Sequence, residues 1–328
     1  YPEPVGSARV YRKLASIAGD GKLHVAGTTT DADGMPIVEA DGRRRTQFVI
    51  DILSGTSAGG INAVFLAKAL SNNQSLDQLA QMWIDEADID VLLNDRHSLT
   101  GTPLELDSLP PSLLNGKRMY YKLLGALDGM DLAQRRAMAR NNPESRPIPL
   151  SQRIDLYSTA TDLDGIAVPI ALADQEVEER RHRNVFHFQH PSQRQQPADR
   201  VELARRDSLS DFTFDINPFL AFAARCTSAF PFAFEPMALC DIGPALKDSE
   251  LHRGERYCTD PDYWRQFYRE YTRDLSRNPG ATRFEHRSFG DGGYLDNKPF
   301  TYAVETILRR QSAKPVDRKL VYLEPSPE

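Results

Sequence analysis

Residues 47–70, QFVIDILSGTSAGGINAVFLAKAL, constrain the fold of this chain more than any other stretch. A run of β-formers leads into a glycine-rich turn, and an almost wholly apolar segment follows at once. A Gly-x-Ser-x-Gly turn between a strand and a helix is typical of a nucleophile elbow. Ser57 then occupies a sharp, strained turn, and Gly55 and Gly59 are small so that strand and helix can pass closely. The alternative is a tight glycine turn before a core helix, because five-residue motifs recur by chance.

The segment after the turn predicts a buried central helix. Asn62 and Lys68 are its clearly polar side chains over residues 61–70, so it is apolar on nearly every side. The N-terminus of such a helix directs partial positive charge at Ser57, which favours an anion forming there.

Composition narrows the class of protein. The chain has 328 residues, of which 40% are hydrophobic and 26% charged, and this is typical of globular proteins. A net charge of -6 disfavours a nucleic-acid partner, because no basic excess exists to neutralise phosphates. The three cysteines lack the spacing of a zinc site or a disulfide framework, so we expect no metal and no cofactor, and a reducing, cytoplasmic location. No apolar run reaches the length of about 18 residues that a membrane-spanning helix needs.

The two ends of the sequence suggest a piece of a longer protein. The chain begins with Tyr1, shows no signal-peptide pattern, and ends shortly after a strand-like segment at residues 320–323.

Residues 94–150 differ in sequence pattern from the segments around them. Prolines interrupt this region, and helical patterns lie between the prolines. An apolar helical face is followed by arginines on what we interpret as a second helix. We expect a helical insertion beside the sheet, either as a lid over the site that touches membrane or as a packed layer. We favour the packed layer, because amphipathic helices normally face a core.

Two further strands are predicted in the middle of the chain. Residues 153–164 and residues 185–189 alternate apolar and polar side chains, and charged runs flank the second stretch. We interpret this region as an exposed hairpin with a polar loop. The histidines gathered there (His182, His187 and His190) are interpreted as surface residues, because neighbouring arginines disfavour a metal ion.

A second candidate for chemistry is Asp291, in the sequence Phe289-Gly290-Asp291-Gly292-Gly293-Tyr294. A carboxylate at a strand end between glycines is presented at the edge of a sheet, with Gly292 and Gly293 supporting it. Asp-Gly is also an ordinary turn signal. A helix beginning near Pro299 is expected next.

A serine hydroxyl needs a base to act as a nucleophile. Elbow hydrolases with a triad run serine, acid, histidine along the chain, yet no histidine follows Asp291. A triad that pairs an acid in the middle of the chain with a later histidine stays open (Asp162 or Asp164 with His252 or His286). A dyad of Ser57 and Asp291 needs fewer coincidences.

Together these blocks resemble the patatin-like phospholipases, and the larger bacterial patatin-related subgroup in particular. The resemblance rests on residues 55–63, on Asp291-Gly292-Gly293 with Asn297 and Pro299, and on two blocks between them, 159–163 and 226–231 with Pro236. It covers essentially the whole chain, residues 1–328, as one hydrolase domain. It implies a three-layer α/β/α sandwich with a central, mostly parallel sheet.

The resemblance also implies hydrolysis of lipid acyl esters, with a lipid substrate and peripheral contact with membrane. Carried over by position, Ser57 is the nucleophile, Asp291 is its base, and the backbone N–H of Ala58 is an oxyanion donor.

One departure matters for activity. The family carries an earlier glycine-rich loop whose amides complete the oxyanion hole, and no such loop precedes Ser57. We expect it upstream of Tyr1, and its loss to lower the rate about 10²–10³-fold. Two other classes stay open: a catalytically impaired hydrolase fold that serves as a binding or scaffold protein, and a phosphate-binding loop. The phosphate-binding loop is disfavoured because Lys-Ser/Thr does not follow Gly59-Gly60.

Overall fold

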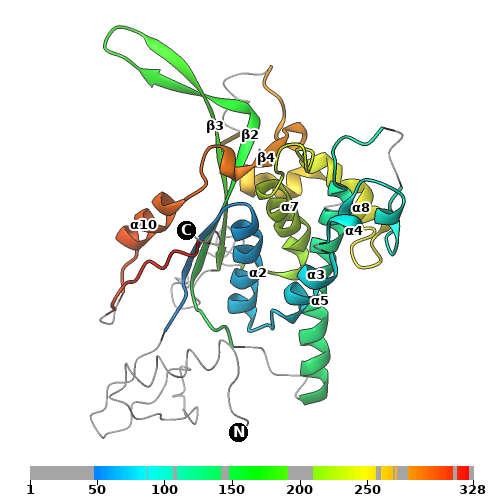
Figure 1. Cartoon of the computed structure of the whole chain (residues 1–328). Coiled ribbons are helices and arrows are strands. Elements are labelled where there is room, and N and C mark those ends of the chain that lie inside the picture. The colour runs from blue at the N-terminus through cyan, green and yellow to red at the C-terminus, as the bar shows by residue number, and fades with distance from the viewer. Residues whose placement is uncertain are drawn as a thin grey trace, which may run out of the picture. The chain divides into compact units, whose positions relative to one another are not determined.

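The computed structural model describes residues 48–86, 88–105, 109–141, 148–190, 210–255, 260–268, 270–271, 280–312 and 316–324. The chain divides into two compact units, Tyr1–Val49 and Ile50–Glu328. All elements discussed below belong to the second unit, whose described residues Figure 1 shows in colour. The polar connection expected at residues 27–46 lies outside the described residues.

A mixed sheet forms the centre of this unit, with β2 (Ile154–Ala171) as its middle strand. β1 (Ile52–Gly55) runs parallel to β2, from Ile52 opposite Asp155 to Gly55 opposite Ser158. β3 (Glu176–His190) and β4 (Phe289–Asp291) are antiparallel to β2. Helices surround this sheet, so the expected α/β class is confirmed.

Helices cover both faces of the sheet (Figure 1). Side chains alternate along a strand, so Leu156 and Tyr157 point to opposite faces. Leu156 lies in the hydrophobic core, together with Phe186 and Phe188 of β3 and the phenylalanines of α7 (Asn217–Thr227). On the other face the Tyr157 hydroxyl lies 2.7 Å from Oγ1 of Thr306 in α10 (Phe300–Arg309).

The segment after the glycine-rich turn is the expected buried helix, α2 (Ala58–Asn72). It packs against the sheet and against α7, and its apolar residues belong to the core. Three further helices are α3 (Asp77–Glu86), the short α4 (Ile89–Leu92) and α8 (Ile242–Asp248). Among the described residues, no helix has both the length and the apolar character needed to cross a membrane.

The helical insertion is built around one long helix, α5 (Gly116–Asn141). The expected break into two helices is wrong, because Arg135 and Arg136 continue the helix that carries Leu123. The buried face of α5 joins the common core and packs against α7 and α3 (Tyr120, Leu123, Leu124, Leu127 and Met130). This burial supports a packed layer rather than a lid.

β2 and β3 form a hairpin that is much longer than the two short strands predicted. The charged run that was expected to flank a strand, residues 176–183, is itself part of β3 and pairs with residues 161–171. A ladder of backbone hydrogen bonds does not require a buried face, so exposed charged residues can continue it. The distal end of the hairpin projects beyond the sheet (Figure 1).

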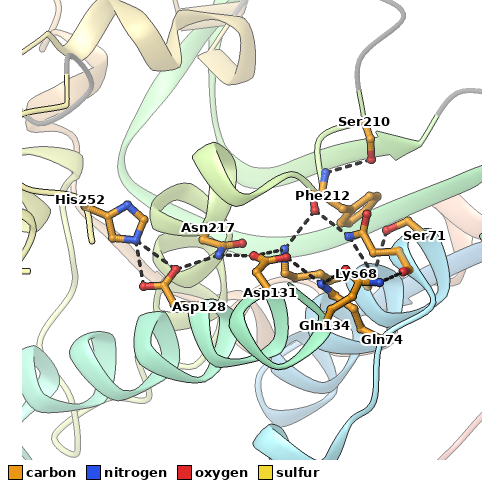
Figure 2. Close-up of polar contacts among 11 residues, drawn as sticks. Lys68, Ser71, Gln74, Asp128, Asp131, Gln134, Ser210, Phe212, Asn217 and His252 are labelled. Carbon is orange, nitrogen blue, oxygen red and sulfur yellow. Dashed lines mark hydrogen bonds and ion pairs between the residues drawn. The ribbon is translucent and has the colours of Figure 1, made fainter. Parts of the chain in front are cut away.

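A buried polar network ties α2 to α5 and α7, as Figure 2 shows. Lys68 of α2 is fully buried, and its Nζ lies 3.0 Å from Oδ2 of Asp131 in α5. The Asn217 side-chain amide donates to Asp131 and to Asp128, 2.9 Å away in each case. Asp128 in turn contacts Nε2 of His252 at 2.9 Å. Lys68, a polar residue of the predicted apolar helix, thus has a charged partner, Asp131, within the core.

Candidate active site

The ends of β1 and β4 converge on one residue of the middle strand. β3 occupies one edge of β2, so β1 and β4 share the other edge and lie end to end along it. β1 ends at Gly55 opposite Ser158, and β4 ends at Asp291 opposite Ala160. The two strands approach from opposite directions and stop on either side of Thr159. This register places the turn that carries Ser57 next to the strand end that carries Asp291.

Ser57 has the strained backbone expected of an elbow. Its φ is 55° and its ψ is -130°, which is unusual for a residue with a side chain. α2 begins at the next residue, and the N–H of Ile61 donates to the Ser57 carbonyl at 3.1 Å. The N–H of Ser57 donates to Oγ1 of Thr227 at 3.0 Å. The strained conformation is therefore held from both sides.

The glycines of the turn divide differently from the prediction. A Cβ on Gly55 would lie 2.5 Å from the carbonyl oxygen of Gly59, so a side chain is excluded there. A Cβ on Gly60 would lie 2.6 Å from the side chain of Thr227. A Cβ on Gly59 would meet nothing within 4 Å. The expected steric need for a small residue therefore falls on Gly55 and Gly60, and the prediction for Gly59 is wrong in this respect.

Asp291 is buried, with 3% of its surface exposed. The N–H of Gly293 donates to its Oδ1 at 2.6 Å, while its Oδ2 has no hydrogen-bond partner among the described residues. Burial raises the pKa of this carboxyl group, and the contacts with Gly293 and with the Ser57 side chain lower it by less. Because Oδ2 has no hydrogen-bond partner among the described residues, it keeps its lone pairs available for a proton.

Close contacts exclude a side chain at Gly292 and crowd one at Gly293. A Cβ on Gly292 would lie 2.3 Å from Oγ1 of Thr159 and 2.5 Å from its carbonyl oxygen. A Cβ on Gly293 would lie 3.0 Å from Oδ1 of Asp291. Gly292 thus lets the chain turn against β2, and Gly293 supplies the amide that orients the carboxylate.

A pair of threonines joins the two halves of the site; both lie in the blocks at residues 55–63 and 159–163, and neither was predicted as a site residue. Oγ1 of Thr56 lies 2.6 Å from Oγ1 of Thr159, and it donates to the carbonyl of Asp296 at 2.8 Å. The elbow is therefore tied to the strand and to the loop after Asp291. Thr227, which accepts from Ser57, was also missed as a site residue, although it lies in the noted block at residues 226–231.

The predicted oxyanion donor lies at the exposed first turn of α2. Ala58 is exposed, and no described residue accepts a hydrogen bond from its N–H. The first N–H groups of a helix have no partner within the helix and carry partial positive charge. An oxyanion on a substrate bound to Ser57 can be stabilised by this N–H.

The histidines considered for a triad are engaged elsewhere or exposed. His252 is buried against Asp128 and stacks on Phe214, with ring centroids 4.9 Å apart. Asp162 forms a buried ion pair with Arg287, with 3.0 Å between Oδ2 and Nη1. His286 and Asp164 are both exposed. The structure assembles no serine, histidine and acid triad from these residues.

The clustered histidines of the hairpin also contact different partners. His187 lies 2.8 Å from Oδ1 of Asp155, His190 lies 2.9 Å from Oγ of Ser210, and His182 lies 2.8 Å from the carbonyl of Asp162. Among the described residues, no group of three histidine, cysteine or acidic side chains could hold a metal ion.

The family model of the patatin-like phospholipases matches residues 37–304, which include both Ser57 and Asp291. The chain belongs to the patatin-like phospholipase family. This membership confirms the predicted family, and it supports a lipid hydrolase function. It also agrees with the helices found on both faces of the sheet.

Among curated proteins, the chain is similar to the uncharacterized membrane protein Rv3479 of Mycobacterium tuberculosis. The two are 29% identical over 282 residues, which cover 84% of this chain and 21% of that protein. The chain therefore spans about a fifth of the length of this relative. No solved structure matches the sequence at a significant level.

Proposed function

We propose that this chain hydrolyses carboxylic esters of phospholipids or related lipids through an acyl-enzyme on Ser57. The observation that carries this proposal is the convergence of the ends of β1 and β4 at Thr159, which brings Ser57 and Asp291 together. Family membership supports the lipid ester as substrate. The cytoplasmic location and the peripheral contact with membrane remain predictions.

In the proposed reaction, Oδ2 of Asp291 accepts the hydroxyl proton as Oγ of Ser57 attacks the ester carbonyl. The tetrahedral oxyanion is stabilised by the N–H of Ala58 and by the N-terminus of α2. Collapse breaks the bond to the alcohol, which leaves with the proton from Asp291. The Asp291 carboxylate then removes a proton from water as the water attacks the acyl-enzyme, and the proton returns to Ser57 when the fatty acid departs.

The raised pKa of Asp291 supports this double role. A carboxyl group exchanges protons most effectively when its pKa lies nearer the working pH. Gly293 holds Oδ1, so Oδ2 remains as the atom that can face the hydroxyl.

The test is turnover by the intact protein with phospholipid and with a short-chain nitrophenyl ester. We expect Ser57→Ala and Asp291→Asn each to abolish hydrolysis, and Ser57→Ala to abolish labelling by a fluorophosphonate. Asp164→Asn is the matched control, because this exposed carboxylate was the alternative acid, and it should retain activity.

Two outcomes would contradict the proposal in different ways. Unchanged turnover in Asp291→Asn would exclude the dyad of Ser57 and Asp291 and favour a histidine as the base. An intact protein whose Ser57 is neither labelled nor active would be an impaired hydrolase fold that binds rather than cleaves.

A further inference from the structure

Exposed apolar side chains gather on two adjoining segments, residues 109–115 and residues 229–234, which we call the apolar rim. The N–H of Leu113 donates to the carbonyl of Phe232 at 3.1 Å, and the N–H of Leu114 donates to Ala233 at 2.8 Å. These bonds hold the segments side by side. The exposed fractions are 83% for Leu109, 61% for Leu113, 62% for Phe230 and 92% for Phe232.

Phe232 has a strained backbone conformation, and its ring is exposed to solvent. Its φ is 64°, in the left-handed region that a phenylalanine rarely adopts. The strain is maintained by the backbone bonds to residues 113 and 114 and by a turn in which Phe234 donates to the Phe230 carbonyl at 3.0 Å. A strained backbone that directs an aromatic ring into solvent indicates a partner that buries the ring.

The apolar rim is continuous with the proposed catalytic site. The N–H of Asp291 donates to the carbonyl of Ala229 at 3.1 Å, and Ala229 is the first residue of the second segment. Two residues earlier, Thr227 accepts the N–H of Ser57. A surface that buries Phe230 and Phe232 would therefore lie directly beside Ser57 and Asp291.

The chemistry of the rim identifies its partner. Its sequences, LPPSLLN and AFPFAF, contain no acidic and no basic residue. The chain as a whole carries a net charge of -6, which would oppose approach to an anionic surface. Prolines at 110, 111 and 231 stiffen both segments, so little conformational entropy remains to be lost on insertion. Uncharged, rigid and aromatic, the rim fits the boundary between head groups and acyl chains.

We propose that the apolar rim inserts into the surface of a zwitterionic phospholipid membrane and thereby presents ester bonds to Ser57. This inference rests on the proposed function for its choice of a lipid partner. It predicts binding through apolar contact rather than charge, with little dependence on salt.

The test measures binding of the intact protein to phosphatidylcholine vesicles by co-sedimentation. Ser57→Ala serves as background, so that the lipid stays intact and binding is separated from hydrolysis. Phe232→Gly removes the ring and relieves the strained φ, so it should fold at least as stably as its parent. We expect it to weaken vesicle binding about tenfold or more, because burial of a phenylalanine is lost. Phe232→Trp should retain binding.

Leu308→Ser is the matched control, because Leu308 is 80% exposed on α10, across the sheet from α2 and α7. It should bind vesicles like its parent. In the protein that retains Ser57, Phe232→Gly should hydrolyse a soluble nitrophenyl ester at the normal rate. It should hydrolyse vesicle lipid more slowly.

Three results would overturn the inference: equal binding by Phe232→Gly and its parent, binding that needs anionic lipid and disappears in salt, or conversion of a dimer to a monomer by Phe232→Gly. The last result would identify a second copy of the chain as the partner. Loss of vesicle binding in Phe232→Gly, together with no ester hydrolysis by the unmodified protein that retains Ser57, would support the rim and reject the proposed function.

Discussion

The backbone N–H of Ser57 donates a hydrogen bond to Oγ1 of Thr227 across 3.0 Å. Thr227 is fully buried at the end of α7, and its side chain also fills the space that a Cβ on Gly60 would need. One side chain therefore fixes both the amide of Ser57, the proposed nucleophile, and the first turn of α2. This contact explains how a non-glycine residue keeps the strained φ of 55°.

Replacing Thr227 with valine should impair the site more than the shape of the core. Valine keeps the volume but removes the acceptor, so the Ser57 N–H loses its partner at a cost of about 1–3 kcal/mol. We expect kcat to fall roughly tenfold or more while KM changes little, because Ser57 is misplaced rather than removed. Thr227→Ser keeps the acceptor and should retain most of kcat. Equal kcat values for Thr227→Val and the unmodified protein would exclude this positioning role.

The turn glycines allow a matched comparison. Gly55→Ala would place a Cβ 2.5 Å from the Gly59 carbonyl oxygen, whereas Gly59→Ala would meet nothing within 4 Å. We expect Gly55→Ala to lower the melting temperature and to abolish labelling of Ser57 by a fluorophosphonate. Gly59→Ala should keep or raise the melting temperature, because alanine is favoured over glycine in a helix by up to about 1 kcal/mol. Thermal unfolding of both variants checks this, and equal losses would show that the close contact is not limiting.

Local patterns were sufficient to predict the elbow, the buried helix after it and the strand-end carboxylate. Glycine spacing and apolar runs report steric requirements that act over a few residues, and these were visible around Ser57 and Asp291. The meeting of β1 and β4 at Thr159 was not predictable in this way, since it depends on the register of strands far apart in sequence. Thr56 and Thr227 were missed for the same reason.

Tertiary contacts also overrode local signals elsewhere. Gly125 and Gly129 weaken intrinsic helix propensity within α5, yet packing against α7 keeps the helix continuous. The charged residues 176–183 show no buried face, yet pairing with β2 makes them a strand.

The pH dependence of activity should reflect Asp291. Burial raises its folded-state pKa, and the proposed mechanism needs the ionised form. The value of kcat/KM should therefore fall on the acid side, with a midpoint above the pKa of an ordinary aspartate. A profile for nitrophenyl ester hydrolysis by the intact protein measures this midpoint. A midpoint at or below the ordinary value would contradict the role of Asp291 as base.

The raised pKa of Asp291 also predicts how stability depends on pH. Ionisation of Asp291 should raise activity but lower the stability of the fold. A carboxyl group whose pKa is raised on folding contributes stability below its unfolded pKa, and this contribution is lost as pH rises through the folded pKa. Asp291→Asn should thus gain stability relative to the unmodified protein between acidic and neutral pH. The difference in melting temperature at pH 4 and pH 7 measures it. If the melting temperature of Asp291→Asn exceeds that of the unmodified protein by less at pH 7 than at pH 4, burial does not destabilise the ionised form of Asp291.

Removing one partner of the ion pair between Lys68 and Asp131 should lower the free energy of unfolding far more than removing both partners together. Burial lowers the pKa of Lys68, and Asp131 is the main partner that opposes this shift. Asp131→Ala leaves a buried ammonium group without its counter-charge, so we expect a loss of about 3–5 kcal/mol in the free energy of unfolding. The double variant Lys68→Met, Asp131→Ala removes both charges and should be more stable than Asp131→Ala alone. Urea unfolding of the single and double variants measures this difference.

The pH response of Asp131→Ala provides an independent check on Lys68. A lysine whose pKa is depressed on folding binds fewer protons in the folded state, so stability rises with pH up to its unfolded pKa. Removal of Asp131 depresses the folded-state pKa further, so the rise should begin at lower pH than in the unmodified protein. The double variant lacks the titrating group and should show no such rise. A double variant that is no more stable than Asp131→Ala, with the same pH slope, would mean that the uncompensated ammonium is not the source of the loss.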